Sequence, residues 1–83
     1  MSFDTLWTAR AKRHLAALPP DVQLRIVRKV VAASADPLRH FARLAGVSAW
    51  RLRVGEYRVI ADVKLRERRI EVLAGGHRKS VYG

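Results

Sequence analysis

Runs of alternating apolar and polar residues in the second half of the chain predict three β-strands. They cover residues 50–54, 57–65 and 69–74, and a charged turn at residues 66–68 separates the last two. Alternation is typical of strands because successive side chains point to opposite faces of a sheet. A further short run at residues 2–7 has β-forming composition and predicts a strand near the N-terminus.

Gly55 and Glu56, between the first two of these runs, predict a two-residue hairpin turn. This turn pairs Arg53 with Arg58 across the hairpin and puts Arg51 on the same face. Neighbouring guanidinium groups would then lie roughly 5 to 7 Å apart. Because facing like charges destabilise a sheet, this basic face indicates a polyanionic ligand.

Apolar residues at helical spacing predict two helices in the first half, over residues 9–18 and 21–34. Thr8 is a good N-cap for the first helix, and Pro19-Pro20 ends it. The second helix carries a wide apolar stripe that we expect to face a core. Its two rows are Leu24, Val27 and Val31, and Ile26, Val30 and Ala33.

The element order β-α-α-β-β-β predicts a small α+β fold, with an antiparallel sheet and both helices packed on one face. We expect one domain over residues 1–83, and a loop with at most a helical turn from Asp36 to Ala49. The opposite face of the sheet would stay open to a ligand.

The composition narrows the class of partner. With 17 Lys and Arg against 7 Asp and Glu, the net charge is +10, which favours nucleic acid, although an acidic protein could also neutralise it. There is no cysteine, so disulfides and thiolate metal sites are excluded. No leader pattern and no apolar run long enough for a bilayer is found, so we expect a cytoplasmic protein without membrane contact.

Candidate chemistry lies at the C-terminal end, which should neighbour the basic hairpin. His77 can exchange a proton near neutral pH, and Tyr82 could stack on a base or transfer a proton. Arg78 and Lys79 add charge between them. The plainer alternatives are a solvated His77 and a Tyr82 that only closes the core.

Other chemistries lack support in the sequence. The three histidines are far apart and have no carboxylate or cysteine companions at ligand spacing, so no metal site and no cofactor is predicted. No glycine-rich loop precedes a helix, and Ser80 has no histidine–carboxylate pair at a recognisable spacing.

Several motifs together resemble the RelE/ParE toxin superfamily, and specifically its RelE-type branch. They are Leu44-Ala45-Gly46, Trp50-Arg51-Leu52-Arg53-Val54-Gly55-Glu56-Tyr57-Arg58-Val59-Ile60 and Gly76-His77-Arg78-Lys79-Ser80-Val81-Tyr82. Trp7-Thr8-Ala9-Arg10-Ala11 and the Leu18-Pro19 break also fit the first strand and helix of the family. The resemblance spans nearly the whole chain.

The resemblance implies the toxin of a type II toxin–antitoxin pair, an mRNA interferase that inhibits translation. Such a hydrolase cuts messenger RNA in the ribosomal A site without a metal. The RNA's own 2′-hydroxyl attacks the adjacent phosphate, leaving a 2′,3′-cyclic phosphate and a free 5′-hydroxyl. The implied partner is an acidic, helical, RelB-like antitoxin, and a heterotetramer with it is one assembly the resemblance allows.

The resemblance also implies roles for individual residues. Arg51 and Arg53 match the basic pair of the family, Arg58 its phosphate-binding arginine, Arg78 its C-terminal arginine and Tyr82 its C-terminal tyrosine. Our working hypothesis makes Arg53, Arg58 and Arg78 the phosphate clamp, with Tyr82 as stacking group and candidate base and His77 as candidate acid. RNA binding would fall to Arg51, Arg53 and Lys79. Some relatives have lysines where Arg51 and Arg53 stand. Arginine keeps its charge at any working pH, so both residues should act electrostatically only.

Two alternatives remain open at this stage. A ParE-type toxin shares the fold and the antitoxin partnership but inhibits DNA gyrase. A catalytically inactive relative would bind RNA without cutting it. Arg58, Arg78 and Tyr82 favour the nuclease.

Overall fold

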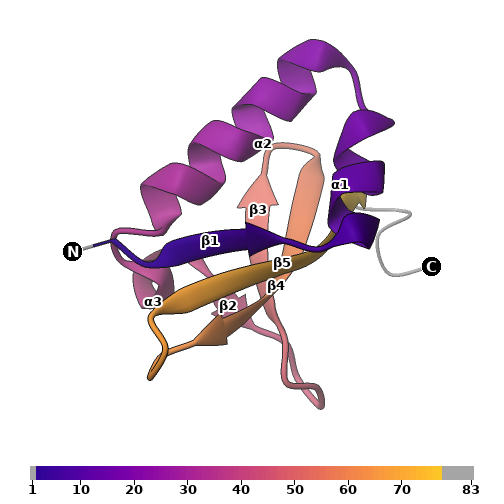
Figure 1. The fold of residues 1–83 in the computed structure, drawn as a ribbon. Coiled ribbons are helices and arrows are strands. Elements are labelled where there is room, and N and C mark those ends of the chain that lie inside the picture. Colours follow the sequence, from indigo (N-terminus) through magenta and orange to yellow (C-terminus); the bar gives the residue numbers. More distant parts are fainter. Residues whose placement is uncertain (1, 78–83) are drawn as a thin grey trace.

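The computed structural model describes residues 2–77 and consists of a five-stranded sheet with helices on one side (Figure 1). The predicted α+β fold is confirmed. The elements in chain order are β1 (Asp4–Trp7), α1 (Ala9–Ala16), α2 (Pro20–Ala33), α3 (Pro37–His40), β2 (Ala42–Arg43), β3 (Trp50–Val54), β4 (Tyr57–Lys64) and β5 (Arg69–His77). In the sheet the strand order is β1-β5-β4-β3-β2.

The sheet is mixed, whereas the sequence predicted an antiparallel one. β2 to β5 form an antiparallel meander, but β1 pairs in parallel with β5, and Thr5 lies opposite Ile70. The helices carry the chain from β1 to the far edge of the sheet, and the meander then returns to β1. The segment expected as a loop supplies the short elements α3 and β2.

The N-cap of α1 acts as predicted, whereas α2 begins one residue earlier than predicted, at Pro20. The Thr8 hydroxyl accepts a hydrogen bond from the backbone N–H of Ala11 at 3.1 Å, which caps α1. Pro20 begins α2, where its missing N–H costs nothing. The Gln23 side chain donates to the Leu18 carbonyl at 2.8 Å and so ties α2 to the end of α1.

The core lies between α2 and the helix-facing side of the sheet. From α2 it takes the row Val22, Ile26, Val30 and Ala33. The other predicted row, which contains Leu24 and Val31, does not face the core, since Leu24 is 51% exposed and Val31 59% exposed. Only one side of α2 packs on the sheet, so this row remains at the surface.

The hairpin register is confirmed. Val54 pairs with Tyr57 and Arg53 with Arg58 around the turn. Gly55 has φ +58°, a left-handed conformation that strains residues with a Cβ, which explains a glycine at this turn. Among the described residues, no helix has the length and apolar character needed to cross a membrane.

Candidate nucleic-acid interface

The sheet has a covered face and an open face, and the open face carries the charged residues. Leu52, Val59 and Val72 point to the helices and are almost fully buried. Their neighbours in sequence therefore point the other way. On that open face the strands β3, β4 and β5 present Arg51, Arg53, Arg58, Ile60, Asp62, Lys64, Arg69 and Glu71.

The basic end of the open face lies beside the β3–β4 turn. Arg53 is exposed and lies directly opposite Arg58, while Arg51 lies opposite Ile60. Arg58 is half-buried, and its Nε is excluded from solvent. Within residues 2–77, neither Arg51 nor Arg53 forms a salt bridge. The predicted pairing of Arg53 with Arg58, with Arg51 on the same face of the sheet, is therefore confirmed.

The other end of the same face is electrically balanced. Glu71 Oε2 lies 2.9 Å from Arg69 Nε and 3.6 Å from Lys64 Nζ. These contacts neutralise part of the charge on β4 and β5 inside the protein. Positive potential on the open face is consequently concentrated at the turn, where a polyanion would bind.

β5 brings a glycine next to the arginine pair. Gly76 lies opposite Arg58 on the neighbouring strand and is buried.

A register shift in β5 decides where His77 lies. Ala61 pairs with Val72 but Ile60 pairs with Ala74, so Leu73 is an extra residue in β5. Past this β-bulge, His77 lies opposite Tyr57, and the two rings meet edge to face with centroids 5.7 Å apart. Tyr57 packs against the core.

His77 thus lies on the helix-facing side of the sheet, whereas Arg53 and Arg58 lie on the open side. Without the shift, Arg58 would pair with Gly75 and His77 would share the arginine face. The sequence interpretation that grouped His77 with the arginines on one concave face is corrected by this bulge. Arg78, Lys79 and Tyr82 lie outside the described residues.

Arg25 is a cation at this end of the molecule that sequence reasoning missed. A Cβ added to Gly55 would lie 3.4 Å from Arg25 Nη1, so the guanidinium group of this α2 residue lies beside the hairpin turn. Arg28 and Lys29 follow on the exposed surface of α2. In the sequence these residues fall outside the two apolar rows of the helix, and only the packing of α2 against β3 brings Arg25 to the turn.

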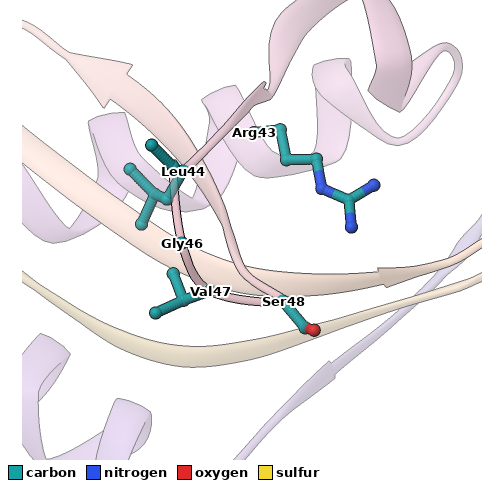
Figure 2. Close-up of a pocket in the computed structure, with 6 residues that line it drawn as sticks. Arg43, Leu44, Gly46, Val47 and Ser48 are labelled. Atoms are coloured by element: carbon teal, nitrogen blue, oxygen red, sulfur yellow. The ribbon is translucent and has the colours of Figure 1, made fainter.

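A hollow of about 630 Å³ lies away from this site, in the loop between β2 and β3. Figure 2 shows Leu44 and Val47 pointing to one side of this loop and the Arg43 guanidinium group to the other. The Arg43 guanidinium lies over the Trp50 ring, 5.7 Å from its centroid. Since Arg43 is the only ionisable residue among those lining the hollow, this loop offers no acid–base pair for catalysis.

Comparison with known proteins identifies the family. The family model of the ParE toxin of type II toxin–antitoxin systems (parDE) matches residues 5–82. The chain belongs to the ParE toxin family. It therefore lies within the RelE/ParE superfamily, as the sequence motifs predicted.

Solved structures of RelE toxins share the fold. The toxin–antitoxin complex RelBE2 from Mycobacterium tuberculosis has a chain 25% identical, with a TM-score of 0.84 over 94% of this chain and 93% of that chain. The archaeal RelE–RelB complex from Pyrococcus horikoshii matches at 22% identity and a TM-score of 0.79, over 98% and 100% of the two chains.

The RelBE complex of E. coli gives 20% identity and a TM-score of 0.76, over 92% of this chain and 96% of that chain. At these identities the last two matches concern the fold alone. No curated protein sequence matches this ParE-family chain.

Proposed function

We propose that this ParE-family protein is a toxin that cleaves messenger RNA in the ribosomal A site. The observation that carries the proposal is the facing pair Arg53 and Arg58 on an open sheet face, with Arg51 beside them. Three guanidinium groups that repel one another are explained by a ligand with several phosphates. The likeness to RelE toxins in fold supports the same activity.

In this mechanism the arginines stabilise negative charge on the phosphates of the RNA and transfer no proton. Arg53 and Arg58 bind the scissile phosphate and stabilise the extra negative charge that develops as the 2′-hydroxyl of the RNA attacks it. Arg51 holds a neighbouring phosphate. The products are a 2′,3′-cyclic phosphate and a free 5′-hydroxyl, so no outside nucleophile is needed.

Proton transfer is assigned to Tyr82, with Arg78 as a third member of the phosphate clamp and Lys79 as an RNA contact. These roles rest on the resemblance of the C-terminal motif. His77 contacts Tyr57 on the other side of the sheet, which argues against its role as the acid at a phosphate bound by Arg53 and Arg58.

The direct test is toeprinting of a messenger RNA on purified ribosomes after the protein is added. We expect new A-site ends with wild-type protein and none with Arg58→Ala or Arg78→Ala, and both variants should relieve growth arrest. Circular dichroism checks that both variants remain folded. Full toxicity of both variants would exclude the phosphate clamp.

The family model, named for ParE, favours DNA gyrase inhibition as the second candidate. A supercoiling assay with purified gyrase separates the two. Loss of supercoiling without A-site cleavage would replace the nuclease proposal.

We further propose that an acidic antitoxin docks an amphipathic helix between α1 and α2. A groove of about 320 Å³ there is lined by Leu15, Pro20, Gln23, Leu24 and Val27. The exposed cation Arg28 lies one helical turn after Leu24 on α2 and borders this groove. An apolar stripe flanked by acidic residues complements this surface in shape and charge. The solved complexes of RelE with RelB support an antitoxin as the partner.

A further inference from the structure

β5 extends beyond the strand that pairs with its outer edge. β1 ends at Trp7, which lies opposite Val72, whereas β5 continues to His77. The following residue, Thr8, still donates its backbone N–H to the Val72 carbonyl at 3.0 Å. From there on, no strand among residues 2–77 pairs with the edge of β5 on the β1 side.

Side chains of α1 provide hydrogen bonds along this edge in place of a strand. The Thr8 hydroxyl donates to the Leu73 carbonyl at 3.4 Å, and the Gly75 N–H donates to His14 Nδ1 at 3.3 Å. Between these two residues α1 turns Ala11 toward the sheet, where it is 2% exposed. This small side chain allows the helix to approach β5 closely.

The contact between His14 and Gly75 lies just after the β-bulge at Leu73. An amide N–H has one hydrogen, so Gly75 donates to His14 and not to another strand. The contact forms in the shifted register, in which Gly76 lies opposite Arg58 and His77 opposite Tyr57. His14 must present an unprotonated Nδ1, which puts the ring hydrogen on Nε2.

We propose that His14 is a positioning residue that holds the end of β5 against the arginine pair. Resting on the proposed nuclease function, this role fixes the point from which the chain continues into Arg78 and Tyr82. His14 itself does not touch RNA. It acts through the Gly75 backbone.

Three substitutions separate the hydrogen bond from other properties of the side chain. His14→Asn keeps an acceptor at the δ position, His14→Gln moves it one bond further out, and His14→Leu removes it. Glutamine is a better helix former than asparagine. Rescue by asparagine alone would thus report the position of the acceptor and not the stability of α1. His40→Leu, in the exposed end of α3, is the matched control for loss of a histidine.

Three measurements on the full-length protein apply to each variant. Amide hydrogen exchange followed by NMR reports protection of the Gly75 N–H, and ring-current shifts report the edge contact between His77 and Tyr57. Ribosome-dependent cleavage reports the consequence for activity. For His14→Leu and His14→Gln we expect Gly75 exchange at least about tenfold faster, altered Tyr57 shifts and slower cleavage. His14→Asn and His40→Leu should resemble wild type.

Unchanged Gly75 exchange in His14→Leu would overturn the proposal, as would unchanged cleavage despite release of the amide. If wild-type protein cleaves no RNA on ribosomes, the proposed function fails. The exchange rates and Tyr57 shifts then still decide whether His14 positions the end of β5.

Discussion

At the residue scale, we expect the facing pair Arg53 and Arg58 to lower the stability of the sheet and to strengthen the binding of RNA. Replacing Arg53 by glutamine keeps a polar side chain, although a shorter one, and removes its charge from the pair with Arg58. We expect the free energy of unfolding to rise by about 0.5 kcal/mol, because a facing like charge is lost. Affinity for single-stranded RNA should fall, and the slope of log K against log salt should shrink by about 0.7, which corresponds to one lost phosphate contact.

The control is Arg66→Gln, in the exposed turn between β4 and β5 at the other end of the sheet. Fluorescence titration with a short RNA over a range of salt, together with urea denaturation, measures both quantities. An equal change of slope in the two variants would mean that RNA binds to general surface charge and not to the arginine cluster.

The arginine pair and the place of His77 show how far residue positions follow from the sequence. The facing pair was predictable because a two-residue turn fixes the register of a hairpin. The side on which His77 lies was not, since it depends on the extra residue Leu73 in β5. Nothing in the local pattern distinguishes Leu73 from an ordinary strand residue, and a shift of one residue exchanges the faces.

At the element scale, α2 combines a buried row with an exposed one, and the two should respond differently to loss of methyl groups. Ile26 is 1% exposed and packs on the sheet. Ile26→Val should lower the free energy of unfolding by about 1 kcal/mol. Val31→Ala, at a position 59% exposed, should change it by less than about 0.5 kcal/mol.

Urea unfolding followed by circular dichroism compares these two variants of the same helix. Similar losses at both positions would mean that α2 packs through both rows, against the structure. The periodicity of α2 predicted its apolar stripe but not which row of the stripe is buried, because that depends on how the helix packs on the sheet. Leu24 and Val27, from the row that does not enter the core, line the groove beside α1.

At the scale of the whole molecule, the fold separates two surfaces. The helices cover one face of the sheet and carry the apolar groove, while Arg53 and Arg58 lie on the opposite face. The net charge of +10 predicted an anionic partner without distinguishing RNA from an acidic protein. The two faces offer a separate place for each, which no composition or motif could reveal, since it follows from the packing of the helices.

This separation predicts that the two activities can be lost independently. Leu24→Glu introduces a negative charge into the exposed groove, so it should weaken binding of the acidic antitoxin at least about tenfold, while cleavage on ribosomes is retained. Arg58→Ala should abolish cleavage and leave antitoxin affinity within about twofold, because the substituted side chain is on the other face of the sheet. Isothermal titration with the proposed antitoxin, and toeprinting with each variant, measure the two effects. Loss of both activities in either variant would show that RNA and antitoxin share one surface, and the groove between α1 and α2 would then no longer be the docking site.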